Sequence, residues 1–193
     1  MEREKRTEKL FRDEVETGRI QFRLRLDSQN WEMPFRMDTL EPAHAPQLPN
    51  QAGRPLEKSL FTPVYANELN PAEQEVAVYL DAQDTLSWWH RNVARTQYRI
   101  QGWKRAKIYP DFIFAVQGEG KVERITVLET KGDQLDNLDT AYKRDVLAFL
   151  TDNFAWDDYI PAGELELVHK NGETVQCALV LMSEWKSNLP SYL

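Results

Sequence analysis

Two short apolar segments joined by a glycine-containing turn constrain the fold of this chain more than any other feature. The first, Asp111–Val116, follows a proline, and the second, Glu123–Lys131, ends before Gly132. The connecting residues 117–121 include two glycines. Because both segments are rich in aliphatic and aromatic residues, we predict two antiparallel strands at the centre of a β-sheet.

Helical patterns flank these strands in the sequence. Asn70 is a favourable N-cap, Pro71 suits the first helical position, and Glu73 lies three residues after the cap. These signals predict a helix that ends near Asp81, and apolar spacing predicts a second helix over residues 136–153. Further strands are predicted at residues 86–94, 97–103, 163–169 and 174–182. This order of elements predicts an α/β fold with a mixed central sheet flanked by helices.

The first 55 residues are predicted to form an N-terminal β-rich extension. Residues 1–14 have the charge density of a short surface helix. Apolar and polar residues alternate in 19–26, which predicts a strand with one solvent-facing side, and 31–37 is its predicted partner. Four prolines and a glycine in 41–56 indicate a linker. The predicted domains are an extension, residues 1–55, and a main domain, residues 56–193.

Composition excludes several classes of protein. With 193 residues, 41% of them hydrophobic and 28% charged, the chain is long and apolar enough to bury a core. A net charge of −7 excludes a uniformly basic nucleic-acid coat, and a single cysteine excludes an internal disulfide framework and a cysteine-rich zinc site. Because no apolar run approaches the length of a membrane span and no signal-peptide core is present, we expect a cytoplasmic protein without membrane contact.

Three charged residues lie near the ends of the two predicted central strands: Asp111, Glu129 and Lys131. Two possible pairings, shifted by two residues, place all three side chains on one face of the sheet, whereas a one-residue shift separates them. Two carboxylates about 5–8 Å apart repel each other unless a cation lies between them. Such oxygen ligands suit Mg²⁺, and a neighbouring lysine can orient water or stabilise charge on a phosphate. This pattern favours metal-assisted phosphodiester hydrolysis over a solvated strand end.

These residues resemble the PD-(D/E)xK nuclease signature, which is matched by Tyr109–Phe112 followed by Leu128–Gly132. Residues 88–92, 101–105 and 139–143 resemble the C-terminal nuclease region of type III restriction enzyme helicase subunits and their relatives. The resemblance covers roughly residues 60–153. It implies a restriction-endonuclease-like fold and a DNA endonuclease activity that depends on Mg²⁺, for which Mn²⁺ can substitute.

The resemblance also implies a role for each residue of the signature. Asp111 and Glu129 are the implied metal ligands, the backbone carbonyl of Thr130 is a possible further ligand, and Lys131 is the implied catalytic lysine. The chain contains no P-loop. The implied partners are therefore DNA and separate helicase or translocase and methyltransferase subunits.

Families of this kind often add a carboxylate from the first helix of the domain, and two residues compete for that role. Glu73 lies on the apolar stripe of the predicted helix and points toward the sheet, whereas Glu75 leans toward solvent. We therefore prefer Glu73 as the additional metal ligand. A glutamate at the third helical position is equally a capping-box residue, so both interpretations of Glu73 stay open.

Positive charge is concentrated in residues 87–107, which contain six basic residues and no acidic one. Aromatic residues are interleaved with them, and this combination favours nucleic acid over a purely structural strand pair. The predicted nucleic-acid-binding residues are Arg91, Lys104, Arg105, Lys107 and, by its match to the family pattern, Lys143. Two alternatives remain: RNA as the substrate, and a non-catalytic module that docks a helicase, a methyltransferase or DNA.

Overall fold

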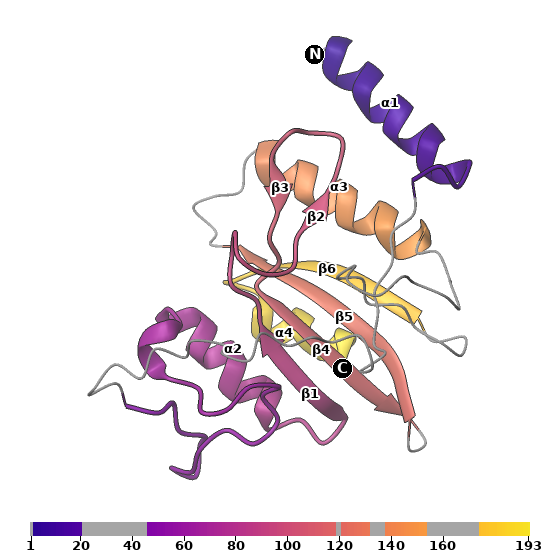
Figure 1. Cartoon of the computed structure of the whole chain (residues 1–193). Helices are drawn as coiled ribbons and strands as arrows, with labels where there is room; N and C mark the ends of the chain where they lie inside the picture. Colours follow the sequence, from indigo (N-terminus) through magenta and orange to yellow (C-terminus); the bar gives the residue numbers. More distant parts are fainter. Residues whose placement is uncertain (1, 21–45, 119–120, 132–137, 154–173) are drawn as a thin grey trace.

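The computed structural model describes residues 2–20, 46–118, 121–131, 138–153 and 174–193 (Figure 1). At 118, 121–123, 131, 138 and 174–175 it describes the backbone alone. The helices are α1 (Glu2–Glu16), α2 (Pro71–Asp81), α3 (Leu138–Asn153) and α4 (Trp185–Asn188), with 3₁₀ turns at Ala66–Glu68 and Leu189–Tyr192. The strands are β1 (Leu86–Arg91), β2 (Ile100–Gln101), β3 (Lys107–Ile108), β4 (Phe112–Gly118), β5 (Lys121–Lys131) and β6 (Thr174–Leu181).

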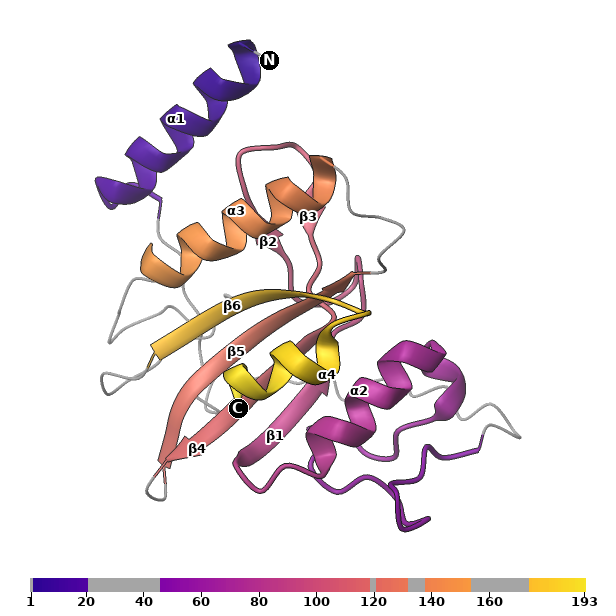
Figure 2. The same ribbon diagram turned by 180° about the vertical axis from the view of Figure 1, so that it is seen from behind.

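A mixed four-stranded sheet forms the centre of the molecule, in the order β1-β4-β5-β6. Strands β1, β4 and β5 are antiparallel neighbours, and β6 runs parallel to β5. A parallel neighbour needs a crossover connection, and α3 lies in the segment that provides it. Figures 1 and 2 show α3 on one side of this sheet and α2 with α4 on the other. The predicted α/β architecture with a mixed, helix-flanked sheet is therefore confirmed.

Alternation along the strands divides the core into two layers, because successive side chains of a strand point to opposite faces. The layer on the α2 and α4 side contains Val76, Leu80, Phe112, Phe114, Leu128 and Trp185. The layer on the α3 side contains Ile113, Ile125, Val127, Val146, Leu147 and Leu150. Both faces of β4 and β5 are therefore covered, as the apolar character of these two strands predicts.

Several predicted segments differ from the observed elements. Strand β1 ends at Arg91 instead of residue 94, and the strand predicted at 97–103 is reduced to β2. The cause is Asn92, whose buried side chain donates hydrogen bonds to the carbonyls of Tyr98 and Pro110 and turns the chain away from the sheet. Helix α1 confirms the helix predicted near the N-terminus. Two predicted strands lie outside the described residues, at 31–37 and 163–169. The strand predicted at 19–26 lies outside them after residue 20.

Residues before the predicted domain boundary contribute to the core of the main domain. Leu48 is buried in the same cluster as Leu56 and Leu69, and its amide donates to the carbonyl of Val64 at 2.8 Å. Part of the proline-rich segment therefore packs against the body. None of the helices in the described ranges has the length and apolarity needed to cross a membrane.

The β2–β3 hairpin stands beside α3 and packs closely against it (Figure 1). Trp103 lies edge-on to Tyr142 of α3 with ring centroids 5.1 Å apart, and the Tyr142 hydroxyl accepts a hydrogen bond from the Lys104 amide at 3.1 Å. At Gly102 the backbone approaches α3 so closely that a Cβ atom would lie 2.5 Å from the Tyr142 hydroxyl and 2.7 Å from Val146 Cγ2. Position 102 therefore has no room for a side chain.

We expect Gly102→Ala to lower the free energy of unfolding by about 1–3 kcal/mol, because the added methyl group overpacks this region. Urea denaturation followed by tryptophan fluorescence measures the change. Tyr142→Phe in the Gly102→Ala background removes the closest atom and should recover part of the loss. A double variant less stable than the sum of the two single changes would contradict the assignment of the clash to the hydroxyl.

Candidate functional site

The candidate site lies where β4 begins and β5 ends. Phe112 pairs with Leu128 and Ile113 with Val127, so the strands have the predicted register in which Asp111 comes opposite Glu129. The Asp111 amide donates to the carbonyl of Leu128 at 2.9 Å. The sheet therefore brings Asp111 next to the Glu129–Lys131 segment, as the sequence predicts.

Thr130 fixes the carboxylate of Asp111. The backbone amide and the hydroxyl of Thr130 donate hydrogen bonds to the same oxygen, Oδ2, at 2.7 and 2.6 Å. Asp111 precedes the first paired residue of β4, so strand alternation does not determine the direction of its side chain. The carboxylate instead takes the place of a backbone carbonyl as the acceptor for the Thr130 amide.

Glu129 is buried, with 4% of its surface exposed, and points toward α3. Its Oε1 accepts a charge-assisted hydrogen bond from Nζ of Lys143, one of the predicted nucleic-acid contacts. A buried carboxylate requires such a cationic partner to stay ionised. Within the described residues, Lys143 therefore balances the charge of Glu129.

Glu73 and Arg91 form a second pair of opposite charges beside Asp111. Glu73 is the N3 residue of a complete capping box with Asn70, so the capping interpretation is confirmed. Nη2 of Arg91 lies 3.1 Å from Oε1 of Glu73. Both oxygens of Glu73 thus have protein partners, whereas Glu75 is exposed and pairs with Lys186. The structure agrees with the predicted orientation of the two glutamates.

The environment of Asp111 makes its ionised form costly. Removal of water around the carboxylate raises its pKa above the usual 3.8, and the charge of Glu73 acts in the same direction. The hydrogen bonds from Thr130 and the charge of Arg91 oppose this effect and only partly offset it. Functional sites often contain a group whose pKa is shifted in this way.

Lys131 occupies the last position of β5, where it pairs with Leu181 of β6. Its side chain lies outside the described part of the structure. Among the residues that are described, no three His, Cys, Asp or Glu side chains gather closely enough to hold a metal ion. The three predicted ligands, Asp111, Glu129 and Glu73, are therefore not gathered into one such group, and each has its own protein partners.

The remaining predicted nucleic-acid contacts fall into two groups. Lys104 lies 3.0 Å from Oε1 of Glu4 in α1, and its ammonium lies 4.5 Å from the centre of the Tyr142 ring. Arg105 and Lys107 are exposed. Arg91, Lys104 and Lys143 each form an ion pair with a glutamate. Arg105 and Lys107 form no ion pair within the described residues.

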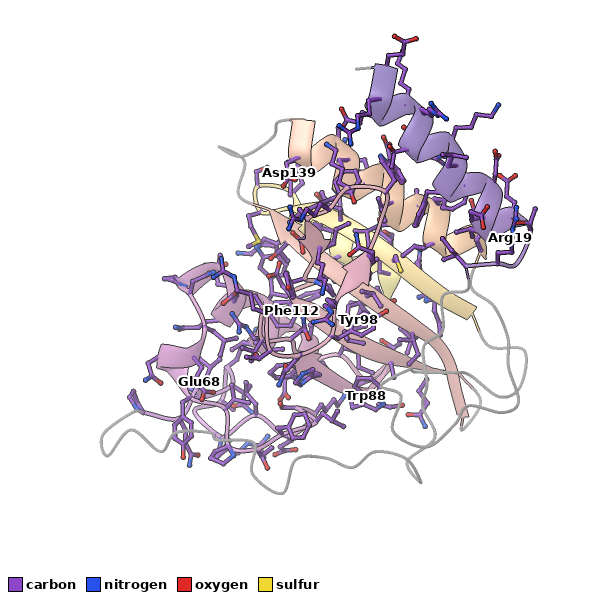
Figure 3. The ribbon with its side chains drawn as sticks, turned by 45° about the horizontal axis from the view of Figure 1, so that its top comes forward. Arg19, Glu68, Trp88, Tyr98, Phe112 and Asp139 are labelled. Carbon is purple, nitrogen blue, oxygen red and sulfur yellow. The ribbon has the colours of Figure 1, made fainter. Side chains whose placement is uncertain are left out.

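Asn92 is a site residue that the sequence analysis does not identify. Its amide donates to the carbonyl of Asp111 at 2.8 Å, and its side chain donates to the carbonyl of Pro110 at 2.8 Å. The same side chain donates to the carbonyl of Tyr98 at 2.9 Å, and Tyr98 and Phe112, the neighbour of Asp111, are labelled in Figure 3. Asn92 therefore holds the segment that carries Asp111. In the sequence, Asn92 lies inside the predicted strand 86–94 and inside the segment 88–92 that resembles the nuclease family, and neither feature predicts this role.

His90 has a structural environment. Nε2 lies 2.9 Å from Oε1 of Gln97, and its ring contacts Phe61 edge-on at 5.0 Å. Burial and the charge of Arg91 lower the pKa of His90, and the bond to Gln97 only partly opposes this. The surroundings therefore favour the neutral imidazole, as expected of a structural histidine.

Comparison with protein-family models, with curated proteins and with solved structures found no match to this chain.

Proposed function

We propose that this chain is a Mg²⁺-dependent DNA endonuclease domain that works with an ATP-dependent helicase in a restriction or related defence system. One observation carries the proposal: the carboxylate of Asp111 is bound to Thr130, the residue between Glu129 and Lys131 in the signature. The mixed sheet with helices on both faces is compatible with the restriction-endonuclease-like fold that the signature implies.

The oxygen atoms of the site fit a divalent cation. Both hydrogen bonds from Thr130 go to Oδ2 of Asp111, and within the described residues Oδ1 accepts none. Carboxylate oxygens of Asp111 and Glu129, with the carbonyl of Thr130, form the hard donor set that Mg²⁺ prefers, and Mn²⁺ accepts the same ligands. Glu73 fits the ion less well, because Asn70 and Arg91 already occupy its oxygens.

Each residue of the site has a defined task in this proposal. A Mg²⁺ ion held by Asp111 and Glu129 would supply polarisation of the phosphate and a lower pKa for a bound water. Thr130 holds Asp111 in one orientation, and Asn92 holds the backbone of Asp111. Lys143 pairs with the buried carboxylate of Glu129. Lys131 is proposed to orient the attacking water or to stabilise the negative charge that develops on the phosphate.

The proposal is tested with supercoiled plasmid, the purified chain, and Mg²⁺, Mn²⁺ or EDTA. We expect nicking or linearisation with either metal ion, none with EDTA, and a loss of at least about a hundredfold in rate for Lys131→Ala. Lys186→Ala is the matched control, since Lys186 is an exposed lysine on α4. Equal rates for the two variants would reject Lys131 as a catalytic residue. RNA of the same sequence, offered as competitor, distinguishes the two nucleic acids.

A non-catalytic docking module is a second candidate, and one observation favours it. Glu73 and Glu129 are each neutralised by a protein cation, Arg91 and Lys143. Carboxylates balanced in this way do not need a metal ion for folding. The docking function predicts that the wild type cleaves no plasmid with any metal ion, while Asp111→Asn retains all binding to DNA or to a helicase.

A further inference from the structure

The segment between Asn92 and Asp111 is a loop followed by a hairpin, and both of its ends meet at the candidate site. Asn92 at its start is hydrogen-bonded to Asp111 at its end, backbone amide to backbone carbonyl. The intervening residues 93–110 contain no acidic residue and five basic ones: Arg95, Arg99, Lys104, Arg105 and Lys107. Positive charge is therefore concentrated in the segment that leads directly to Asp111.

The hairpin has an apolar inner face and a charged outer face. Ile100, Trp103 and Ile108 are buried against α3, where they pack with Tyr142 and Val146. Gln101 pairs with Lys107 across the strands, and both side chains are exposed. Arg99, which directly precedes β2, is also exposed. The side-chain amide of Gln101 donates to the carbonyls of Gly102 and Lys104, which braces the tip that carries Arg105.

Hydrogen bonds hold the loop at residues 93–99 in place. The Val93 amide donates to Oε1 of Gln97 at 2.7 Å, and the same oxygen lies 2.9 Å from Nε2 of His90. Arg95 in this loop has φ of 70°, in the left-handed region that favours glycine. Its side chain is exposed. A non-glycine residue in this conformation carries local backbone strain.

Four cations of this segment are available to an external anion. Arg95, Arg99, Arg105 and Lys107 are exposed. None of the four forms an ion pair with a carboxylate in the parts of the chain that the structure describes. Exposed cations concentrated in one segment of a chain with net charge −7 favour the binding of an anion by that segment.

We propose that these four residues, the cationic arm, bind the phosphate backbone of duplex DNA beside the site of cleavage. The proposal deepens the endonuclease function and rests on it for the identity of the ligand. It adds Arg95 and Arg99 to the predicted contacts. It assigns Arg91, Lys104 and Lys143 to internal pairs instead. Because the arm binds phosphates, it has no base specificity and does not need a metal ion.

The test is fluorescence anisotropy of a labelled duplex in EDTA with the full chain, at several salt concentrations. We expect Arg105→Gln with Lys107→Gln to weaken binding roughly tenfold and to reduce the slope of log K against log salt by about 0.9 for each phosphate that is no longer neutralised. The matched control, Arg54→Gln with Lys186→Gln, removes the same charge from exposed residues elsewhere. Equal changes in slope for the two double variants would overturn the proposal.

Arg95→Gly gives a second test, in which weaker DNA binding cannot be attributed to a less stable fold. It relieves the left-handed backbone conformation, so the variant should unfold at the same urea concentration as the wild type or a higher one. We expect weaker DNA binding in spite of this. Unchanged affinity would remove Arg95 from the arm.

The two proposals fail in different ways. Arm-dependent duplex binding in EDTA without plasmid cleavage in Mg²⁺ supports the arm and rejects the endonuclease. Cleavage with no effect of the arm variants on affinity supports the endonuclease and overturns the arm. Stronger arm-dependent binding to double-stranded RNA than to DNA of equal length would overturn the choice of ligand.

Discussion

The Asp111→Asn variant is expected to lose plasmid cleavage by at least about a hundredfold while its folded state becomes no less stable than the wild type at pH 7. The loss of activity follows from the charge that the proposed metal site requires. The equal or higher stability of the folded variant follows from the environment of the Asp111 carboxylate. Asparagine keeps an oxygen that accepts both hydrogen bonds from Thr130, but it carries no charge that must be removed from water.

The raised pKa of Asp111 gives this prediction a pH dependence. The folded state binds the Asp111 proton more tightly than the unfolded state, whose carboxyl has the ordinary value of 3.8. The carboxylate therefore opposes folding at neutral pH, and this penalty disappears as the pH falls through the raised pKa toward 3.8. The advantage of the variant should accordingly be largest at pH 7 and should vanish in acid.

Urea denaturation of both proteins between pH 3.5 and 7 measures the difference, and the plasmid assay measures the activity. An Asp111→Asn variant that is less stable at pH 7 than the wild type would show that the carboxylate is mainly a structural acceptor. A variant that keeps full cleavage would remove Asp111 from the catalytic machinery.

Asp81→Ala is expected to have the opposite effect, a loss of about 3–5 kcal/mol in the free energy of unfolding with cleavage retained. Asp81 ends α2 and is buried. Its carboxylate accepts hydrogen bonds from the amides of Glu57 and Lys58 at 3.1 and 2.8 Å and from Nε1 of Trp89 at 3.0 Å. Alanine would leave all three donors without this acceptor, and Trp89 is fully buried.

Calorimetry should record a midpoint roughly 10 °C lower for Asp81→Ala, given the size of the chain. Asp84→Ala is the control, since Asp84 is an exposed aspartate three residues further along the chain. Cleavage is measured well below the midpoint. Equal midpoints for the two variants would contradict the assigned role of Asp81, and absence of cleavage in a folded Asp81→Ala protein would show that it also acts at the site.

Features that depend on neighbouring residues were predictable from the sequence. The start of α2 depends on Asn70, Pro71 and Glu73, and its capping box forms as expected because the two hydrogen bonds join residues three positions apart. The pairing of β4 with β5 was also predictable, but its register was not. Both faces of these strands are apolar, so the sequence left two pairings and a one-residue shift open, and the structure has the pairing that puts Asp111 opposite Glu129.

Charge pairing was not predictable in the same way. Glu73 pairs with Arg91 18 residues away, and Glu129 pairs with Lys143 14 residues away. The sequence indicated that these residues belong to one region, but it assigned both cations to nucleic acid. Which carboxylate a cation contacts depends on how α2 packs against β1 and how α3 packs against β5, and no local pattern encodes those distances.

The sequence alone determined the α/β class, the central antiparallel strands and the meeting of Asp111 with the Glu129–Lys131 segment, because strand periodicity and hydrophobic burial act through nearby positions. Only the tertiary structure decided that Thr130 holds Asp111, that Asn92 ends β1, and which cations remain exposed. Those outcomes require donors and acceptors from separate elements to come within about 3 Å. That geometry exists only after the helices have packed on the sheet.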